Sequence, residues 1–211
     1  SESRGFRSVF TGIAFIRNQR AVLGAISLDL FAVLLGGATA LLPIYARDIL
    51  HTGPWGLGML RSAPAVGALV MSVILARRPV GRRVGQTMFT AVIVFGAATV
   101  VFAVSSSMVL SFAALCVLGA ADVFSVVIRL TLVQLATPDH MRGRVSAVNA
   151  LFIGTSNQLG EFESGVTAAL FGTIPAVVIG GVGTIIIALL WMRLFPEIRR
   201  IDTFESIRIP S

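Results

Sequence analysis

The stretch VGQTMFTAVIVFGAATVVFAV, residues 84–104, carries no charged side chain over its whole length. A hydrocarbon core about 30 Å thick is spanned by about 20 apolar residues of α-helix, because each residue advances the helix by about 1.5 Å. An arginine-rich segment, RRPVGRR at 77–83, precedes this stretch, and the polar run SSS at 105–107 follows it. Residues 84–104 therefore predict a transmembrane helix bounded by polar connections.

The same pattern continues on both sides of this helix. Hydrophobic residues make up 55% of the 211 residues and charged residues only 13%, whereas soluble domains average about 25% charged residues. The remaining apolar residues gather in blocks of similar length at 21–45, 57–76, 108–136, 145–171 and 175–195. The predicted fold class is an all-α polytopic membrane protein with six transmembrane helices.

The arginines indicate on which side of the membrane each connection lies. They are concentrated in 1–20, 77–83, 137–144 and 196–211, whereas the connections 46–56, 105–107 and 172–174 contain only Arg47. By the positive-inside rule, the arginine-rich segments and both termini are cytoplasmic, which agrees with an even number of spans. We expect an amphipathic helix on the membrane surface over 1–20, the bundle over 21–195 and a poorly ordered cytoplasmic tail over 196–211.

Composition and spacing disfavour several other classes of protein. The formal net charge is +7, but the arginines lie in short clusters between apolar blocks and not on one face with stacking aromatics, so no nucleic-acid partner is predicted. Cys116 is the single cysteine, which excludes an intramolecular disulfide. His51 and His140 fall in connections on opposite sides of the membrane, so no metal site or other cofactor is expected. The sequence contains no catalytic motif, and an enzyme is not predicted.

Several polar side chains lie inside the predicted spans. An isolated charge at mid-bilayer costs about 2.5 kcal/mol or more, so such groups must face protein or a water-filled cavity. One interpretation is a substrate cavity or a proton relay, and the other is a set of structural ion pairs that lock the bundle. The candidates are Asp29, Asp122, Arg129, Asn157 and Glu161.

Helix geometry relates some of these candidates to one another. Asp29 and Arg129 lie about 10–12 Å from the same membrane surface, so their depth permits an ion pair. Asp122 and Arg129 are two turns apart on one helix, too far for a direct bond. Asn157 and Glu161 share a helix face because they are four residues apart, whereas Glu163 points away from that face. Trp191, near a span end, is expected to be an interfacial anchor.

Three stretches of the sequence resemble one family. They are LLPIYARDIL (41–50), GPWGLGMLRSAPAVGAL (53–69) and TPDHMRGRVSAVNALFIGTSNQLGEFESG (137–165). Together they are similar to the C-terminal half of a major facilitator superfamily transporter, in the branch that includes the enterobactin (siderophore) exporters. The resemblance implies half of a two-part fold, in which the six helices form two inverted three-helix repeats and substrate binds between the halves.

The resemblance also implies partners and a gating region. RRPVGRR (77–83) occupies the place of the basic loop of the superfamily but lacks its usual acidic residue. The expected gating residues are arginines in the two cytoplasmic connections: Arg78, Arg82, Arg83, Arg142 and Arg144. The implied partners are membrane lipid, a small-molecule substrate, a proton, and the N-terminal six-helix half or a second copy of this chain. The implied location is the bacterial plasma (inner) membrane.

These observations bear on three classes of function. The favoured one is secondary active, proton-coupled export of small amphiphilic molecules such as siderophores or drugs, with Asp29, Asp122 and Glu161 as proton carriers. The alternative is a non-transporting membrane scaffold, or a remnant half that pairs with another bundle. An intramembrane enzyme is disfavoured by the lack of a catalytic constellation.

Overall fold

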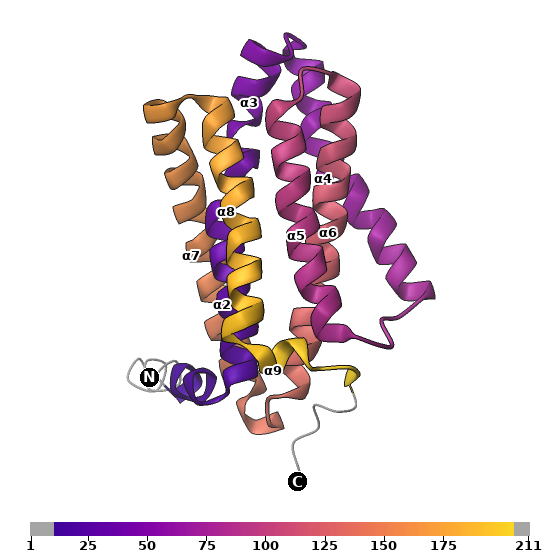
Figure 1. The fold of residues 1–211 in the computed structure, drawn as a ribbon, viewed down its shortest axis with the longest axis vertical. Helices are drawn as coiled ribbons and strands as arrows, with labels where there is room; N and C mark the ends of the chain where they lie inside the picture. Colours follow the sequence, from indigo (N-terminus) through magenta and orange to yellow (C-terminus); the bar gives the residue numbers. More distant parts are fainter. Residues whose placement is uncertain (1–10, 205–211) are drawn as a thin grey trace.

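The computed structural model describes residues 11–204, and within them all regular structure is helical (Figure 1). Residues 11–18 form a short helix, and six longer helices run side by side along the molecule. These are α2 (Arg20–Leu35), α4 (Gly53–Arg77), α5 (Val84–Val104), α6 (Met108–Leu135), α7 (Asp139–Phe171) and α8 (Thr173–Leu194). The all-α, membrane-type fold is therefore as predicted; residues 1–10 and 205–211 of the expected surface helix and tail lie outside the described residues.

Five segments of the described chain are long and apolar enough to cross a membrane: Arg20–Ile49, Gly53–Arg77, Val84–Val104, Met108–Leu135 and Thr173–Leu194. The helix α7 spans 33 residues but is less apolar. Its centre carries the polar run Asn157, Gln158, Glu161 and Glu163. The sixth crossing, and with it the arrangement as two inverted repeats, stays a prediction.

The first predicted span is interrupted, which the apolar pattern alone did not indicate. The helix α2 ends at Leu35, and a 3₁₀ turn over Gly37–Leu41, the short α3 (Leu42–Ile44) and a π-turn over Tyr45–Ile49 continue it. Gly36 and Gly37 favour such a break because glycine is a poor helix former. A side chain at Gly37 would collide with Gly160 and Ser164 of α7. The absence of a side chain at Gly37 therefore lets the 3₁₀ turn and α7 approach closely.

Small residues bring α4 and α6 into backbone contact. Gly67 lies against the carbonyl of Cys116, and Gly119 lies against the carbonyl of Pro64. Lipid tails are as apolar as the side chains of the helices, so the hydrophobic effect does not drive the helices together. Close dispersion contacts of this kind hold them together instead. Beyond this crossing, the C-terminal half of α4 leans away from α5 and α6 (Figure 1), and Leu69 is 67% exposed.

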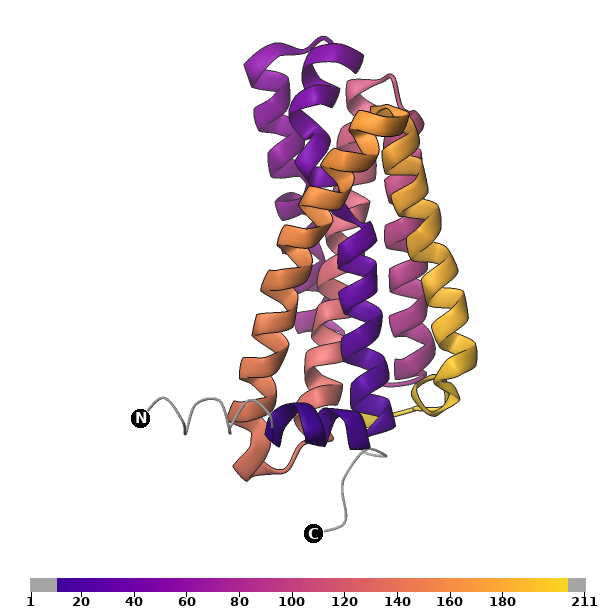
Figure 2. The same ribbon diagram turned by 90° about the vertical axis from the view of Figure 1, so that its left-hand side faces the viewer.

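The helix 11–18 and the short α9 (Pro196–Arg199) lie at the same end of the bundle (Figure 2), which we call the basic end. Ile198 of α9 is fully buried, and side chains at Gly24 or Gly85 would collide with it. The expectation that the tail is poorly ordered from residue 196 onward is thus wrong for 196–204. An isoleucine flanked by charged residues docks because two glycines leave room for it.

Two other expectations also need correction at this end. The connection predicted over 137–144 is mostly helical, since α7 begins at Asp139 directly after Pro138, a residue whose missing N–H suits a helix start. Trp191 is not a simple interfacial anchor: its indole Nε1 donates to Ser27 Oγ at 3.0 Å, and its ring packs against Phe31 and Phe195. The ring therefore joins α8 to α2.

Candidate functional site

A cavity of about 490 Å³ lies among α2, α4, α6 and α7 at the level where α2 breaks. Its wall is partly apolar, with Val33, Leu118, Val126 and Ile153, and contains the glycines of the helix break. All five polar residues singled out from the sequence line it: Asp29, Asp122, Arg129, Asn157 and Glu161. The structure therefore brings together polar residues from three helices, α2, α6 and α7.

The innermost group is an ion pair. Arg129 Nη1 of α6 lies 2.7 Å from Asp29 Oδ2 of α2, and both side chains are at least nine-tenths buried. The pairing that depth permitted is thus present. Arg129 Nε and Nη1 are buried and have no hydrogen-bond partner among the described residues, so the guanidinium of this cavity-lining residue retains unused donor capacity.

Two further carboxylates complete the polar lining. Asp122 lies two turns before Arg129 on α6 and is half-buried, and no described cation lies within ion-pair distance of it. Glu161 and Asn157 reach the cavity from the exposed face of α7. Glu163, two residues further on, does not line it and instead accepts a hydrogen bond from Thr167 Oγ1 at 2.9 Å. The angular separation of Glu161 and Glu163 is as predicted.

The cavity extends inward as a narrow recess of about 20 Å³ between α2, α5 and α6. Asp29 and Asp122 border both the cavity and the recess, and Ser125 borders only the recess. A volume of this size accommodates one water-sized group. The carboxylate residues Asp29 of α2 and Asp122 of α6 thus border one recess of this size.

Some lining residues were missed from the sequence. Phe95 comes from α5, and Thr39 comes from the 3₁₀ turn after the helix break. Pro64 of α4 also lines the cavity. Hydropathy does not indicate which face of α5 turns toward the cavity, nor that the helix breaks at Gly36. The only sequence feature that could have indicated the break is the pair Gly36–Gly37 inside a span, followed closely by Thr39.

The five candidate gating arginines lie apart from this cavity, in or near the connections of the basic end. Arg78 and Arg82 have no ion-pair partner in the described part of the chain. Arg83 precedes α5 with φ 55°, and its backbone N–H donates to Asp202 Oδ1 at 3.1 Å.

The other two belong to α7 and not to a loop. Arg142 pairs with Asp139 one turn away at 2.7 Å, and both side chains are at least half exposed. Arg144 Nη1 lies 3.7 Å from Met141 Sδ. An exposed pair within one helix contributes little, so the geometry by itself assigns no gate to either arginine.

Among residues 11–204, no group of His, Cys, Asp or Glu side chains is arranged to hold a metal ion. The chemistry available in the cavity is that of carboxylates, one guanidinium, one amide and hydroxyl groups. Carboxylates in a largely apolar enclosure can exchange protons and attract cations, and a guanidinium can hold a carboxylate or another oxyanion.

Comparison with known proteins places these features in context. A family model described as transmembrane secretion effector, within the major facilitator group, matches residues 4–210. The chain is also 24% identical over 194 residues to an enterobactin exporter of Citrobacter koseri, and the alignment covers 92% of this chain. It covers 46% of that exporter, so the chain spans about half the length of the relative it matches.

Proposed function

Because the chain belongs to the transmembrane secretion effector family of the major facilitator superfamily, we propose that it forms one half of a proton-coupled exporter of small amphiphilic molecules. Membership of this family supports the general function of a transporter. The driving ion and the class of substrate are the finer parts of the proposal. The similarity to an enterobactin exporter adds siderophores to the candidate substrates.

The observation that carries the proposal is the composition of the cavity. Three carboxylates and one guanidinium from α2, α6 and α7 line a single space, and only Asp29 and Arg129 are paired with each other. If the charges served only to lock helices together, each would be matched to a partner, because an unpaired charge at membrane depth is costly. Asp122 and Glu161 have no such partner among the described residues.

The proposed mechanism divides the charged groups by their surroundings. Asp122 and Glu161 take up and release protons as the cavity faces one side of the membrane and then the other. Arg129 holds Asp29 in the empty state, and its guanidinium attracts a carboxylate or other oxyanion of a substrate. The apolar wall formed by Val33, Leu118 and Ile153 then receives the hydrophobic part of the same molecule.

The cavity opens on the exposed face of α7, where Asn157 and Glu161 lie. We place the other half of the transport pathway against this face, contributed by an N-terminal six-helix bundle or by a second copy of this chain. The basic end would then face the cytoplasm of a bacterium, in keeping with the positive-inside rule.

The test uses the complete product of the gene that encodes these residues, reconstituted in proteoliposomes. We expect an imposed proton gradient to drive uptake of a fluorescent amphiphile or of enterobactin, and a protonophore to abolish that uptake. Flux that is unaffected by the protonophore would contradict the proposed coupling of transport to protons. No flux of any tested amphiphile, from a folded protein, would favour the scaffold or remnant alternative.

A further inference from the structure

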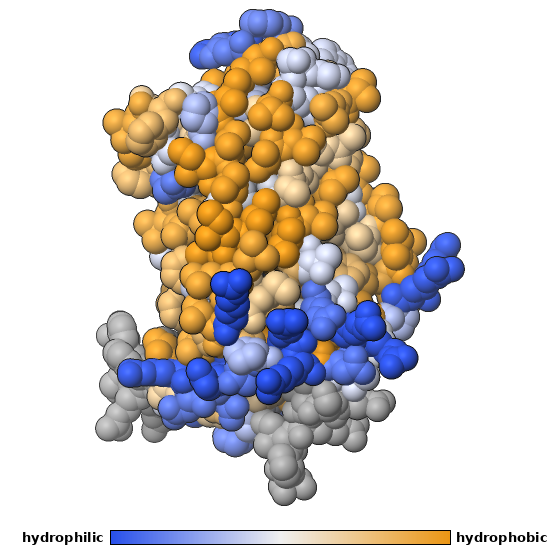
Figure 3. All heavy atoms as spheres, viewed as in Figure 1, coloured by the Kyte–Doolittle hydropathy of each residue, from blue (hydrophilic) through white to orange (hydrophobic). Residues whose placement is uncertain are grey.

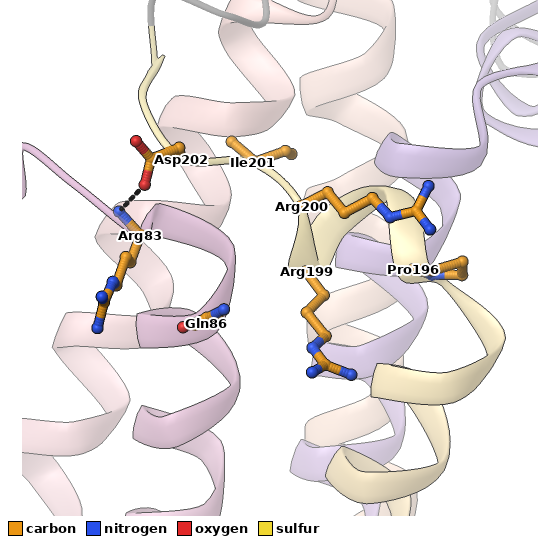
Figure 4. Close-up of a pocket in the computed structure, with 7 residues that line it drawn as sticks. All are labelled: Arg83, Gln86, Pro196, Arg199, Arg200, Ile201 and Asp202. Atoms are coloured by element: carbon orange, nitrogen blue, oxygen red, sulfur yellow. Dashed lines mark hydrogen bonds between the residues drawn. The ribbon is translucent and has the colours of Figure 1, made fainter.

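The basic end carries a second hollow, separate from the transport cavity. A pocket of about 420 Å³ lies between the start of α5 and the α9 segment (Figure 4). Arg83 and Gln86, at the start of α5, line one wall of the pocket. Arg199 and Arg200, at the end of α9, belong to the other wall. Figure 4 shows the side chains of Arg83 and Arg199 extending in the same direction from the two walls.

The walls are held at a fixed separation by hydrogen bonds between α5 and the segment after α9. Arg83 N donates to Asp202 Oδ1 at 3.1 Å, Val84 N to Asp202 O at 3.2 Å, and Gly85 N to Ile201 O at 3.1 Å. Burial of Ile198 against Gly85 secures the same junction. Arg83, Arg199 and Arg200 therefore extend from backbone segments that are hydrogen-bonded or packed against each other.

The charges of this pocket are unbalanced. Within residues 11–204, no acidic side chain forms an ion pair with Arg83, Arg199 or Arg200, whereas Arg20, Arg47, Arg129 and Arg142 each have one. The carboxylate that lines the pocket, Asp202, is directed to the backbone of Arg83. A guanidinium group without an acidic partner can bind the oxygens of a phosphate with paired, charge-assisted hydrogen bonds.

The surface next to the pocket indicates where such a phosphate comes from. Gln86, Val94 and Val101 lie within about 80° of one another around α5 at about 100° per residue, and all three are exposed. Figure 3 shows a continuous apolar surface directly beyond the hydrophilic rim of the basic end. A headgroup at Gln86 therefore has an apolar helix face beside it for its acyl chains.

We propose that this pocket binds the phosphate of an anionic membrane lipid, whose acyl chains lie along the exposed face of α5. Basic pockets at the cytoplasmic ends of transmembrane helices recognise anionic headgroups in this way. The bound lipid would tie α5 to α9 at the junction between bundle and tail. The proposal does not depend on transport or on its substrate.

The test measures the midpoint of thermal unfolding of the complete gene product in detergent. Phosphatidylglycerol, phosphatidylcholine and inorganic phosphate are titrated separately. We expect phosphatidylglycerol to raise the midpoint and the other two to have little effect. Stabilisation by inorganic phosphate equal to that by phosphatidylglycerol would assign the pocket to a soluble anion and overturn the lipid assignment.

Two charge-matched double variants separate a site from general attraction to anionic detergent–lipid micelles. Arg83→Gln with Arg199→Gln should raise the half-saturating concentration of phosphatidylglycerol by roughly tenfold or more, since both changes remove charge-assisted hydrogen bonds to the phosphate in the pocket. Arg17→Gln with Arg77→Gln removes the same charge from the same end and should leave the titration unchanged. Equal weakening in both variants, or none in the first, would contradict the proposal.

A measurement on the unaltered protein covers the case in which the first variant does not fold. A photoreactive phosphatidylglycerol should crosslink to peptides from 83–101 and 196–204. Crosslinking confined to other segments would overturn the assignment.

Discussion

At the scale of single residues, Asp29 and Arg129 depend on each other in a way that a double variant can measure. Removing one member of a buried ion pair leaves the other charged without a partner, which typically destabilises a protein by about 3 kcal/mol or more. We therefore expect Arg129→Ala to lower the midpoint of thermal unfolding in detergent strongly. Arg129→Ala combined with Asp29→Asn should recover part of that loss.

The matched control is the exposed pair Arg47–Asp48, whose side chains are 78% and 48% exposed. Arg47→Ala should shift the midpoint little, because exposed ion pairs contribute about 0–1 kcal/mol. Equal destabilisation by Arg129→Ala alone and by the double variant would show that Asp29 is not the group that Arg129 neutralises.

The residues of the cavity differ in how far the sequence could predict them. The sequence permitted a pair between Asp29 and Arg129, because charges at membrane depth require partners and the depths of these two agree. Glu161 was separated from Glu163 by helix periodicity. Phe95 could not be assigned, because an apolar span such as α5 gives no indication of which face turns inward. Thr39 could not be assigned either, because hydropathy does not show the helix break that places it.

At the scale of elements, the crossing of α4 and α6 depends on the absence of side chains. Gly67 faces the Cys116 carbonyl so closely that a methyl group there would force the helices apart, whereas Gly58 of the same helix has open space beside its Cα. We expect Gly67→Ala to lower the unfolding midpoint. Gly58→Ala should leave it unchanged or raise it slightly, since alanine favours helix.

These two variants share one helix and one chemical change, so they differ only in packing. If Gly67→Ala is as stable as Gly58→Ala, the close crossing of α4 and α6 is not needed for stability.

The elements also show where a hydropathy pattern stops being informative. It placed the start of α5 and the end of α7 correctly, because polar residues bound apolar blocks there. It missed the end of α2, since Gly36 and Gly37 interrupt a helix without interrupting its hydrophobicity. It missed the docking of 196–204 as well, because Ile198 is one apolar residue in a polar segment and its binding site is made by distant glycines.

At the scale of the whole molecule, the distribution of arginine predicts which end faces the cytoplasm. Cysteine at Gly143 of the basic end should be protected from an impermeant thiol reagent added outside intact cells, and cysteine at Ser106 of the opposite end should be labelled. Both positions suit the experiment: Gly143 has open space beside it, and Ser106 is exposed in the turn between α5 and α6. Labelling at Gly143 and not at Ser106 would show that the basic end faces the outside of the cell.

The open side of the cavity predicts the behaviour of the isolated bundle. Asn157 and Glu161 lie on the exposed face of α7, and large apolar side chains of α4 such as Leu69 are uncovered. Residues 1–211 expressed alone should therefore self-associate in detergent and catalyse no gradient-driven flux. A monodisperse monomer that transports in liposomes would show that the cavity needs no second half.

The most direct test of the central claim compares Glu161→Gln with Glu163→Gln in the complete gene product. Both changes neutralise one carboxylate on α7, but only Glu161 lines the cavity. If cavity carboxylates couple transport to protons, Glu161→Gln abolishes efflux driven by a proton gradient yet retains exchange of substrate across the membrane, whereas Glu163→Gln retains both. Full gradient-driven efflux by Glu161→Gln would contradict the assignment of this carboxylate to proton coupling.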